Sequence, residues 1–268
     1  MRVSAAERTM NYVILVLFAL FAAAPMVIIL RTAFSARLGE TGDFHPGNFI
    51  DAWRIGNFTD TFINSVVVAV IVVVLAIALS TLAGYAFATM RFRGSQVLFQ
   101  LFLLGLMIPS EAVVIPLFFD LRTMGLTDTY FAIAMPQVAQ SVAFGTFWMR
   151  AQFRSMPRSL LEAAALDGAT AVKGLTRILV PAARPSIVTL GVLLLVWTWN
   201  EFLVALVMAP SGRLRTAPLG LANFQGQYTA ETALLAAAAV IVALPMLLVF
   251  VFLHRQFISG MLEGAARD

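Results

Sequence analysis

The stretch EAAALDGATAVKGLTRILVP, residues 162–181, lies between two of the most hydrophobic segments of the chain. It carries charge along its length, two glycines interrupt it, and a proline closes it. Charged side chains are costly to place inside a lipid bilayer, so such a stretch does not cross one. We therefore expect a surface loop here, joining two membrane-crossing segments.

The first half of this loop carries the signals of a short helix. Ser159 and Glu162 have the spacing of a capping box, which predicts a helix from about Leu160 to Asp167. Gly168 can adopt the left-handed conformation and so end that helix.

The second half predicts another short helix after a glycine turn. Thr170 can cap it, and Val172, Leu175 and Leu179 fall on one of its faces. The residue before a proline disfavours the helical conformation, so this helix is expected to end before Pro181.

Small side chains distinguish the first predicted helix. Ala163, Ala164 and Ala165 form a row that another surface can approach closely, and Glu162 and Asp167 frame it with negative charge. A helix this short is marginal alone, which favours a peg stabilised by the cleft of a partner. The alternative is a solvated amphipathic connector in which Glu162 only caps its own helix and the nearby arginines bind lipid headgroups.

The composition of the whole chain requires lipid as part of its solvent. Of its 268 residues, 60% are hydrophobic and 12% are charged, and its mean hydropathy is +0.89. A bilayer core needs about 20 apolar residues for each helical span. Six segments qualify, near residues 12–30, 66–88, 97–119, 130–149, 187–209 and 233–253. We expect an all-α polytopic membrane protein with six transmembrane helices.

The distribution of basic residues predicts the orientation. Most of the 18 Lys and Arg residues fall before the first span, after the second, between the fourth and fifth, and after the sixth. The positive-inside rule therefore places both termini and the 150–186 loop in the cytoplasm. This bias also accounts for the net charge of +4, so no nucleic-acid partner is expected.

Several kinds of chemistry are not expected from this sequence. It has no cysteine, and its two histidines, His45 and His254, are far apart, so no metal site is predicted. It has no phosphate-binding loop of the G-x-x-x-x-G-K-[ST] type. An intramembrane enzyme would need a nucleophile and a base that the chain does not supply. We expect a non-catalytic protein without a cofactor of its own.

The loop resembles the EAA signature of ABC importer permeases, a family of bacterial inner-membrane proteins. The matching positions are Glu162, Ala163, Ala164, Asp167, Gly168, Ala169, Ile178 and Pro181. Val180 stands where the family usually has Leu. The stretches WNEFL at 199–203 and FISGMLEGAARD at 257–268 look like the sugar-importer subgroup, closest to the maltose-type "G" permease, and FINSVVVAV at 62–70 looks like the family's entry to its second span.

The resemblance implies a set of partners. A second permease subunit would complete the pore, and an extracytoplasmic binding protein would deliver the solute. Two cytoplasmic ATPase subunits would bind ATP and magnesium, and the EAA loop would be the helix that couples to them. The implied division is an N-terminal transmembrane helix with its outward loop, residues 1–61, and a permease core of five helices, residues 62–268.

Polar residues at membrane depth are candidates for the solute path. They are Glu111, Gln137, Trp199, Asn200 and Glu201. Ionisable residues at such depth tend to face a bundle interior or water. Hydrogen bonds between helices are the alternative explanation, and the one we favour for each residue. Glu111 follows Pro109, where the helix is expected to break.

The outward loop between the last two spans is longer and polar. By the resemblance, Asn223, Gln225 and Tyr228 would touch the binding protein; a plain connector is the alternative. An ABC permease for an amino acid, a peptide or a polyol phosphate stays open. An ion-coupled secondary transporter would leave the EAA loop unexplained.

Overall fold

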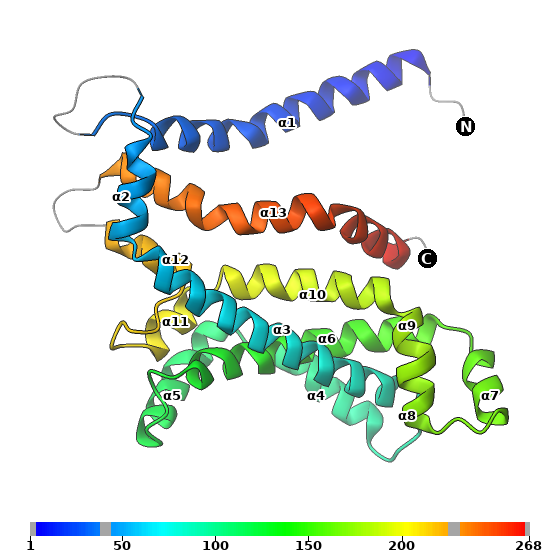
Figure 1. Cartoon of the computed structure of the whole chain (residues 1–268). Coiled ribbons are helices and arrows are strands. Elements are labelled where there is room, and N and C mark those ends of the chain that lie inside the picture. The colour runs from blue at the N-terminus through cyan, green and yellow to red at the C-terminus, as the bar shows by residue number, and fades with distance from the viewer. Residues whose placement is uncertain (1–3, 38–43, 225–230, 266–268) are drawn as a thin grey trace. The chain divides into compact units, whose positions relative to one another are not determined.

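The computed structural model describes residues 4–37, 44–224 and 231–265, with side chains placed at residue 4 and over 7–37, 44–224 and 231–253. Throughout these ranges the regular structure is helical, and they contain no strand (Figure 1). The all-α expectation is confirmed.

The helices follow one another with short connections. They are α1 (Ala5–Ala33), α2 (Gly47–Ile55), α3 (Phe58–Thr89), α4 (Ser95–Met107), α5 (Ser110–Thr123), α6 (Tyr130–Ser155), α7 (Ser159–Leu166), α8 (Ala171–Gly174), a π-helical turn (Leu175–Leu179), α9 (Val180–Ala182), α10 (Arg184–Trp199), α11 (Leu203–Met208), α12 (Ala217–Gly220), a 3-10 turn (Leu221–Phe224) and α13 (Thr232–Ala265).

Three described helices are long and apolar enough to cross a membrane unaided: Glu7–Ala33, Phe58–Thr89 and Thr232–Leu253. Two bent pairs could each supply one more span, α4 with α5 at 96° and α8–α9 with α10 at 76°. The described residues thus provide three to five spans by length and composition, and the predicted number of six is not confirmed. Helix α6, the fourth predicted span, is not among the five, and many of its side chains are buried by the protein itself.

Two of the predicted spans are interrupted. The break between α4 and α5 falls at Ile108 and Pro109, as the proline predicts. The break between α10 and α11, at Asn200 to Phe202, was not expected, because the sequence there has no proline or glycine. The segment 187–209 is therefore not one continuous helix.

The described contacts divide the chain into two compact units. One comprises Met1–Thr59 with Gly220–Pro245, and the other Asp60–Leu219 with Met246–Asp268. In the first unit the amide of Asn48 on α2 donates to the carbonyls of Ala33 and Ser35, which fixes this helix at the end of α1. The division into residues 1–61 and 62–268 stays a prediction.

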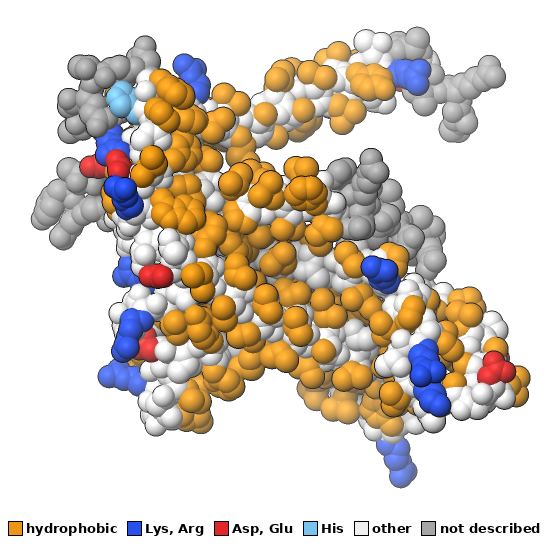
Figure 2. Space-filling view, viewed as in Figure 1, with side chains coloured by type: hydrophobic (Ala, Val, Ile, Leu, Met, Phe, Trp, Pro, Cys, Tyr) orange, Lys and Arg blue, Asp and Glu red, His pale blue; other side chains and the backbone are white. Residues whose placement is uncertain are grey.

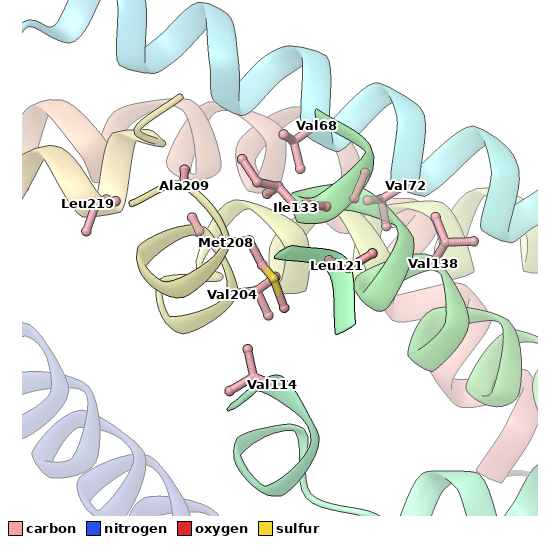
Figure 3. Close-up of a cluster of buried hydrophobic side chains, with 13 residues drawn as sticks. Val68, Val72, Val114, Leu121, Ile133, Val138, Val204, Met208, Ala209 and Leu219 are labelled. Atoms are coloured by element: carbon pink, nitrogen blue, oxygen red, sulfur yellow. The ribbon is translucent and has the colours of Figure 1, made fainter. Parts of the chain in front are cut away.

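The second unit contains two clusters of buried apolar side chains. The first cluster joins α3, α5, α6 and α11 through Val68, Val72, Leu121, Ile133, Val204 and Met208, among others (Figure 3). The second, here called the loop-side cluster, comprises Ala76, Tyr85, Met149, Phe153, Leu175, Leu179, Ala183, Leu190 and Leu194. It joins α3, α6 and α10 to the polar loop that follows α6.

Helices α3 and α6 touch through their backbones at two glycines. A Cβ atom added at Gly84 would lie 2.6 Å from the Cβ of Met149, and one added at Gly145 would lie 2.7 Å from the Cβ of Ser80. Both distances are shorter than real contacts, so only glycine permits this approach.

The exposed surface is largely apolar. Hydrophobic side chains cover the flanks of the helices, and the Lys and Arg side chains in view lie near helix ends (Figure 2). A helix that is apolar on all sides needs lipid or another protein around it. Helix α1 meets this description, because the 18-residue apolar window within it has no buried residue.

Candidate functional site

The helix that carries the predicted coupling residues is α7. It begins at Ser159, one residue earlier than expected, with Arg158 as its cap and no side-chain capping bond. The predicted capping box is therefore wrong, because Ser159 already lies inside the helix. The amide of Leu160 donates to the carbonyl of Pro157, so the backbone turns before the serine.

Helix α7 ends just before Gly168, as predicted. The amide of Ala169 donates to the carbonyl of Ala164 at 2.9 Å, and that of Gly168 to the carbonyl of Ala165 at 3.1 Å. These two bonds form a Schellman motif, which needs a left-handed residue just after the helix. Gly168 supplies it with φ of +76°.

The alanines of α7 do not share one exposed face. Ala164 is only 8% exposed, whereas Ala163 and Ala165 are open to solvent. The methyl group of Ala164 is buried by the chain itself, and the predicted partner contact of this residue stays a prediction. The most exposed apolar side chains of the loop are larger than alanine. Leu166 is 90% exposed and Val172 is 70% exposed.

The carboxylates of Glu162 and Asp167 are exposed beside this surface. Within the described part of the chain, neither forms an ion pair or a side-chain hydrogen bond. Both are therefore available to a cationic group from outside the chain.

The second half of the loop differs from the expected helix in two ways. Thr170 caps α8 as predicted, accepting a hydrogen bond from the amide of Lys173 at 3.4 Å. The helix does not stop before Pro181, however, but widens into the π-helical turn and continues through α9. Pro181 follows the π-helical turn, in which the amide of Val180 donates to the carbonyl of Leu175, so the change of hydrogen-bond register falls where proline lacks an N–H.

Leu175 and Leu179 are buried in the loop-side cluster, and Ile178 is half-buried. Val172 is 70% exposed and does not belong to this cluster. The hydroxyl of Tyr85 on α3 donates to the carbonyl of Ala171 at 3.2 Å. One side of the loop is thus packed against α3, α6 and α10, and Leu161 of α7 packs against the same cluster, while Leu166 stays exposed.

A cavity of about 610 Å³ lies between α4, α6 and α10. Its lining brings together three of the predicted path residues, Gln137, Asn200 and Glu201, with Gln140, Phe144 and Trp197. Glu111 does not line this cavity. It is exposed in the first turn of α5, where a negative charge interacts favourably with the positive end of the helix dipole.

The polar side chains of this cavity are partly used by the protein. The amide of Gln137 donates to the carbonyl of Ile133 at 2.9 Å, and that of Asn200 to the carbonyl of Val196 at 2.7 Å. One oxygen of Glu201 accepts from the amide of Val204 at 2.9 Å and so caps α11. Within the described part of the chain, these three side chains form no further hydrogen bond.

The two tryptophans on α10 have different surroundings. Trp197 lines the cavity, is 48% exposed, and lies 4.8 Å from Phe144 between ring centroids. Trp199 is 4% exposed and meets the ring of Phe62 edge-on at 5.6 Å, so the candidate path residue of this pair is not in the cavity. The two tryptophans are so close in the sequence that it could not show which of them lines the cavity.

The outward loop is tied to the helices by residues of the FINS stretch. Asn64 donates to the carbonyl of Arg215 at 3.0 Å and accepts from the hydroxyl of Tyr130 at 2.6 Å, while Ser65 accepts from the amide of Ala217 at 2.8 Å. We did not expect this role for Asn64, which no local pattern indicates.

The predicted contacts to a binding protein are only partly described. Asn223 is exposed and donates to the carbonyl of Ile55 at 3.2 Å. Gln225 and Tyr228 lie outside the described residues. Among the side chains that the structure does describe, no three His, Asp or Glu residues gather as a metal site would require.

Comparison with known proteins places these features in a family. Residues 76–262 match the family described as binding-protein-dependent transport system inner membrane component. The probable ABC transporter permease protein YurM of Bacillus subtilis (strain 168) is 32% identical over 97% of this chain and 88% of its own length. The trehalose transport system permease protein SugB of Mycobacterium tuberculosis (strain CDC 1551 / Oshkosh) is 32% identical over 82% and 81%.

The fold is also that of a solved transporter. A bacterial ABC transporter involved in the import of the acidic polysaccharide alginate contains a chain that matches with a TM-score of 0.78. The two are 23% identical, and the match covers 96% of this chain and 99% of the other. The chain belongs to the family of binding-protein-dependent transport system inner membrane components, the permease subunits of ABC importers.

Proposed function

We propose that this permease imports a sugar or oligosaccharide, and that α7 couples it to an ATPase. The observation that carries the coupling is that the loop leaves Leu166 and Val172 exposed while Leu175 and Leu179 are buried. An exposed apolar surface of this kind marks a contact with another protein. ATP would bind to that other subunit and not to this chain, which hydrolyses nothing.

The mechanism follows from how the loop is held. A partner that grips α7 through Ala163 and Leu166 pulls on a segment whose second half is packed against α3, α6 and α10. Displacement of α7 is therefore passed to these helices, as in other transporters whose domains move as rigid bodies. Gly168 supplies the turn between the gripped and the packed halves.

The cavity of about 610 Å³ is the proposed stretch of solute path in this subunit. Phe144 and Trp197 offer apolar ring faces, and Gln137, Gln140 and Asn200 offer hydrogen-bonding groups beside them. This combination suits a sugar, which has apolar C–H faces and many hydroxyl groups. The trehalose system of the SugB relative supports this solute class.

The complete importer in this proposal has further subunits. A second permease completes the pore, two ATPases lie below the coupling loops, and a binding protein delivers the solute on the other side. Asn223, Gln225 and Tyr228 are the proposed contacts to that binding protein.

Site-directed crosslinking tests the coupling role directly. Because the chain has no cysteine, a single introduced one is unique. Ala163→Cys and Leu166→Cys should each crosslink to the ATPase subunit in native membranes, whereas Ala164→Cys, which is buried, should crosslink much less. Equal yields at all three positions, or none at the exposed two, would contradict this assignment.

Transport assays separate coupling from the choice of solute. Gly168→Pro should abolish uptake of every solute while the chain still reaches the membrane, because proline cannot adopt a positive φ. A panel of sugars, amino acids, peptides and polyol phosphates would identify the class carried. Uptake of a non-sugar alone would leave the coupling role intact and refute the sugar assignment.

A further inference from the structure

A second cavity lies apart from the proposed solute path. It has a volume of about 980 Å³ and runs between the end of α3, the connection to α4 and the turn between α6 and α7. Arg91, Arg93, Arg154 and Arg158 line it, with Glu162 as the acidic residue of the lining. We call it the arginine groove.

The four arginines form no pairing with the side chains that the structure describes. Across the residues that the structure describes, none of these guanidinium groups forms an ion pair or a side-chain hydrogen bond. Four like charges on one groove repel one another, and a bound anion would relieve that repulsion. Arginine forms paired hydrogen bonds to phosphate oxygens, which makes phosphate the anion that best fits its geometry.

Apolar residues alternate with the arginines along the same wall. Met90 and Phe92 are exposed on either side of Arg91, and Phe153 and Leu179 line the groove more deeply. A soluble phosphate has no apolar group that could contact such a surface, whereas a phospholipid places glycerol and acyl carbons beside its phosphate. The groove also lies where α3 and α6 end, at the cytoplasmic side of the predicted topology.

We infer that the arginine groove binds the headgroup of an anionic phospholipid. The phosphate lies among the arginines, and the upper acyl carbons lie along Met90 and Phe92. Glu162 at the rim disfavours a second negative charge there. The site is separate from the solute cavity, since the two linings share no residue.

Lipid retention by the purified full-length chain tests this site. The protein in a neutral detergent is offered equal amounts of phosphatidylglycerol and phosphatidylcholine, and retained lipids are counted by native mass spectrometry. We expect a preference for phosphatidylglycerol that falls roughly fivefold for each arginine removed in Arg91→Gln/Arg154→Gln. Arg91→Lys/Arg154→Lys keeps the charge and should keep most of the preference.

The matched control removes two arginines that do not line the groove. Arg122→Gln/Arg213→Gln lowers the net charge equally and should leave the preference unchanged. An equal loss in this control, or no loss in the groove variant while it remains folded by thermal unfolding, would overturn the assignment.

Two further outcomes would distinguish a phospholipid from other occupants of the groove. Glycerol 3-phosphate in solution should not displace the lipid; if it competes as well as phosphatidylglycerol, the site takes free phosphate esters instead. If the groove variant retains lipid normally but no longer co-purifies with an ATPase subunit, the groove is a protein-docking surface and the lipid assignment is wrong.

Discussion

Tyr85 and Ala171, 86 residues apart in the chain, are joined by a hydrogen bond of 3.2 Å from the phenol hydroxyl to the carbonyl oxygen. The tyrosine ring is buried and meets Phe153 edge-on at 6.3 Å. A single side chain therefore ties α3 to the second half of the loop that follows α6.

Tyr85→Phe should loosen the loop without unfolding the protein. The substitution keeps the ring and removes one hydrogen bond, which costs about 0.5–1.5 kcal/mol. Hydrogen exchange should accelerate in residues 171–179, and uptake should fall. Tyr12→Phe, on the exposed surface of α1, is the control and should change neither. Unchanged exchange in both variants would show that the bond does not hold the loop.

Gly168→Ala should destabilise the loop through its backbone alone. No heavy atom lies within 4 Å of an added Cβ, but φ is +76°. The expected cost is about 1–2 kcal/mol, measured as lower thermal stability and lower uptake. Gly47→Ala tests the same change where space is equally open and φ is ordinary, and it should have little effect. Identical behaviour of the two variants would contradict the strain argument.

Asn64 should tolerate neither Ala nor Asp. Alanine leaves the carbonyl of Arg215 and the hydroxyl of Tyr130 without their partner, at about 1–3 kcal/mol. Aspartate keeps the acceptor for Tyr130 but sets a carboxylate against a carbonyl, so it should be at least as harmful. Faster hydrogen exchange in residues 211–217 is the readout, with the exposed Asn11→Ala as control.

Gly145→Leu should separate α3 from α6. The new side chain would overlap Ser80, and overpacking of this kind costs about 1–3 kcal/mol or more. Gly105→Leu adds the same atoms where the nearest neighbour of a Cβ is Ala143 at 3.9 Å, and should be far milder. Thermal unfolding in detergent compares the two, and equal midpoints would argue against a close helix crossing.

Replacing each of the two tryptophans of α10 by alanine should affect different properties of the protein. Trp197→Ala opens one wall of the proposed solute cavity and should reduce sugar uptake with little change in thermal stability. Trp199→Ala removes a buried ring packed on Phe62 and should cost about 3–5 kcal/mol of stability. The reverse pattern would exchange their roles and place the path elsewhere.

Local chemistry in the sequence was enough to predict some of these features. Gly168 ends α7 because few other residues accept its backbone angles, and Pro109 breaks the third span because it lacks an N–H. Thr170 caps α8 for an equally local reason. Each of these predictions depends on a few neighbouring residues.

Features that depend on distant contacts were missed. The helix continues past Pro181 after a π-helical turn. Nothing in the residues of that turn indicates the change from α-helical to π-helical hydrogen bonding. Asn64 meets Arg215 across 151 residues of chain. Ala164 is buried only because α7 folds back on its neighbours, which a helical pattern by itself does not reveal.

The glycine contacts between α3 and α6 restrict how the protein can move. Backbones in direct contact cannot slide without losing their fit, so these helices behave as a single lever with Tyr85 near one end and Gln137 farther along. Under the proposed mechanism, a push delivered at the loop then tilts one wall of the proposed solute cavity instead of being absorbed between the helices. The bending that remains must occur where helices are already broken, near Pro109 and Asn200.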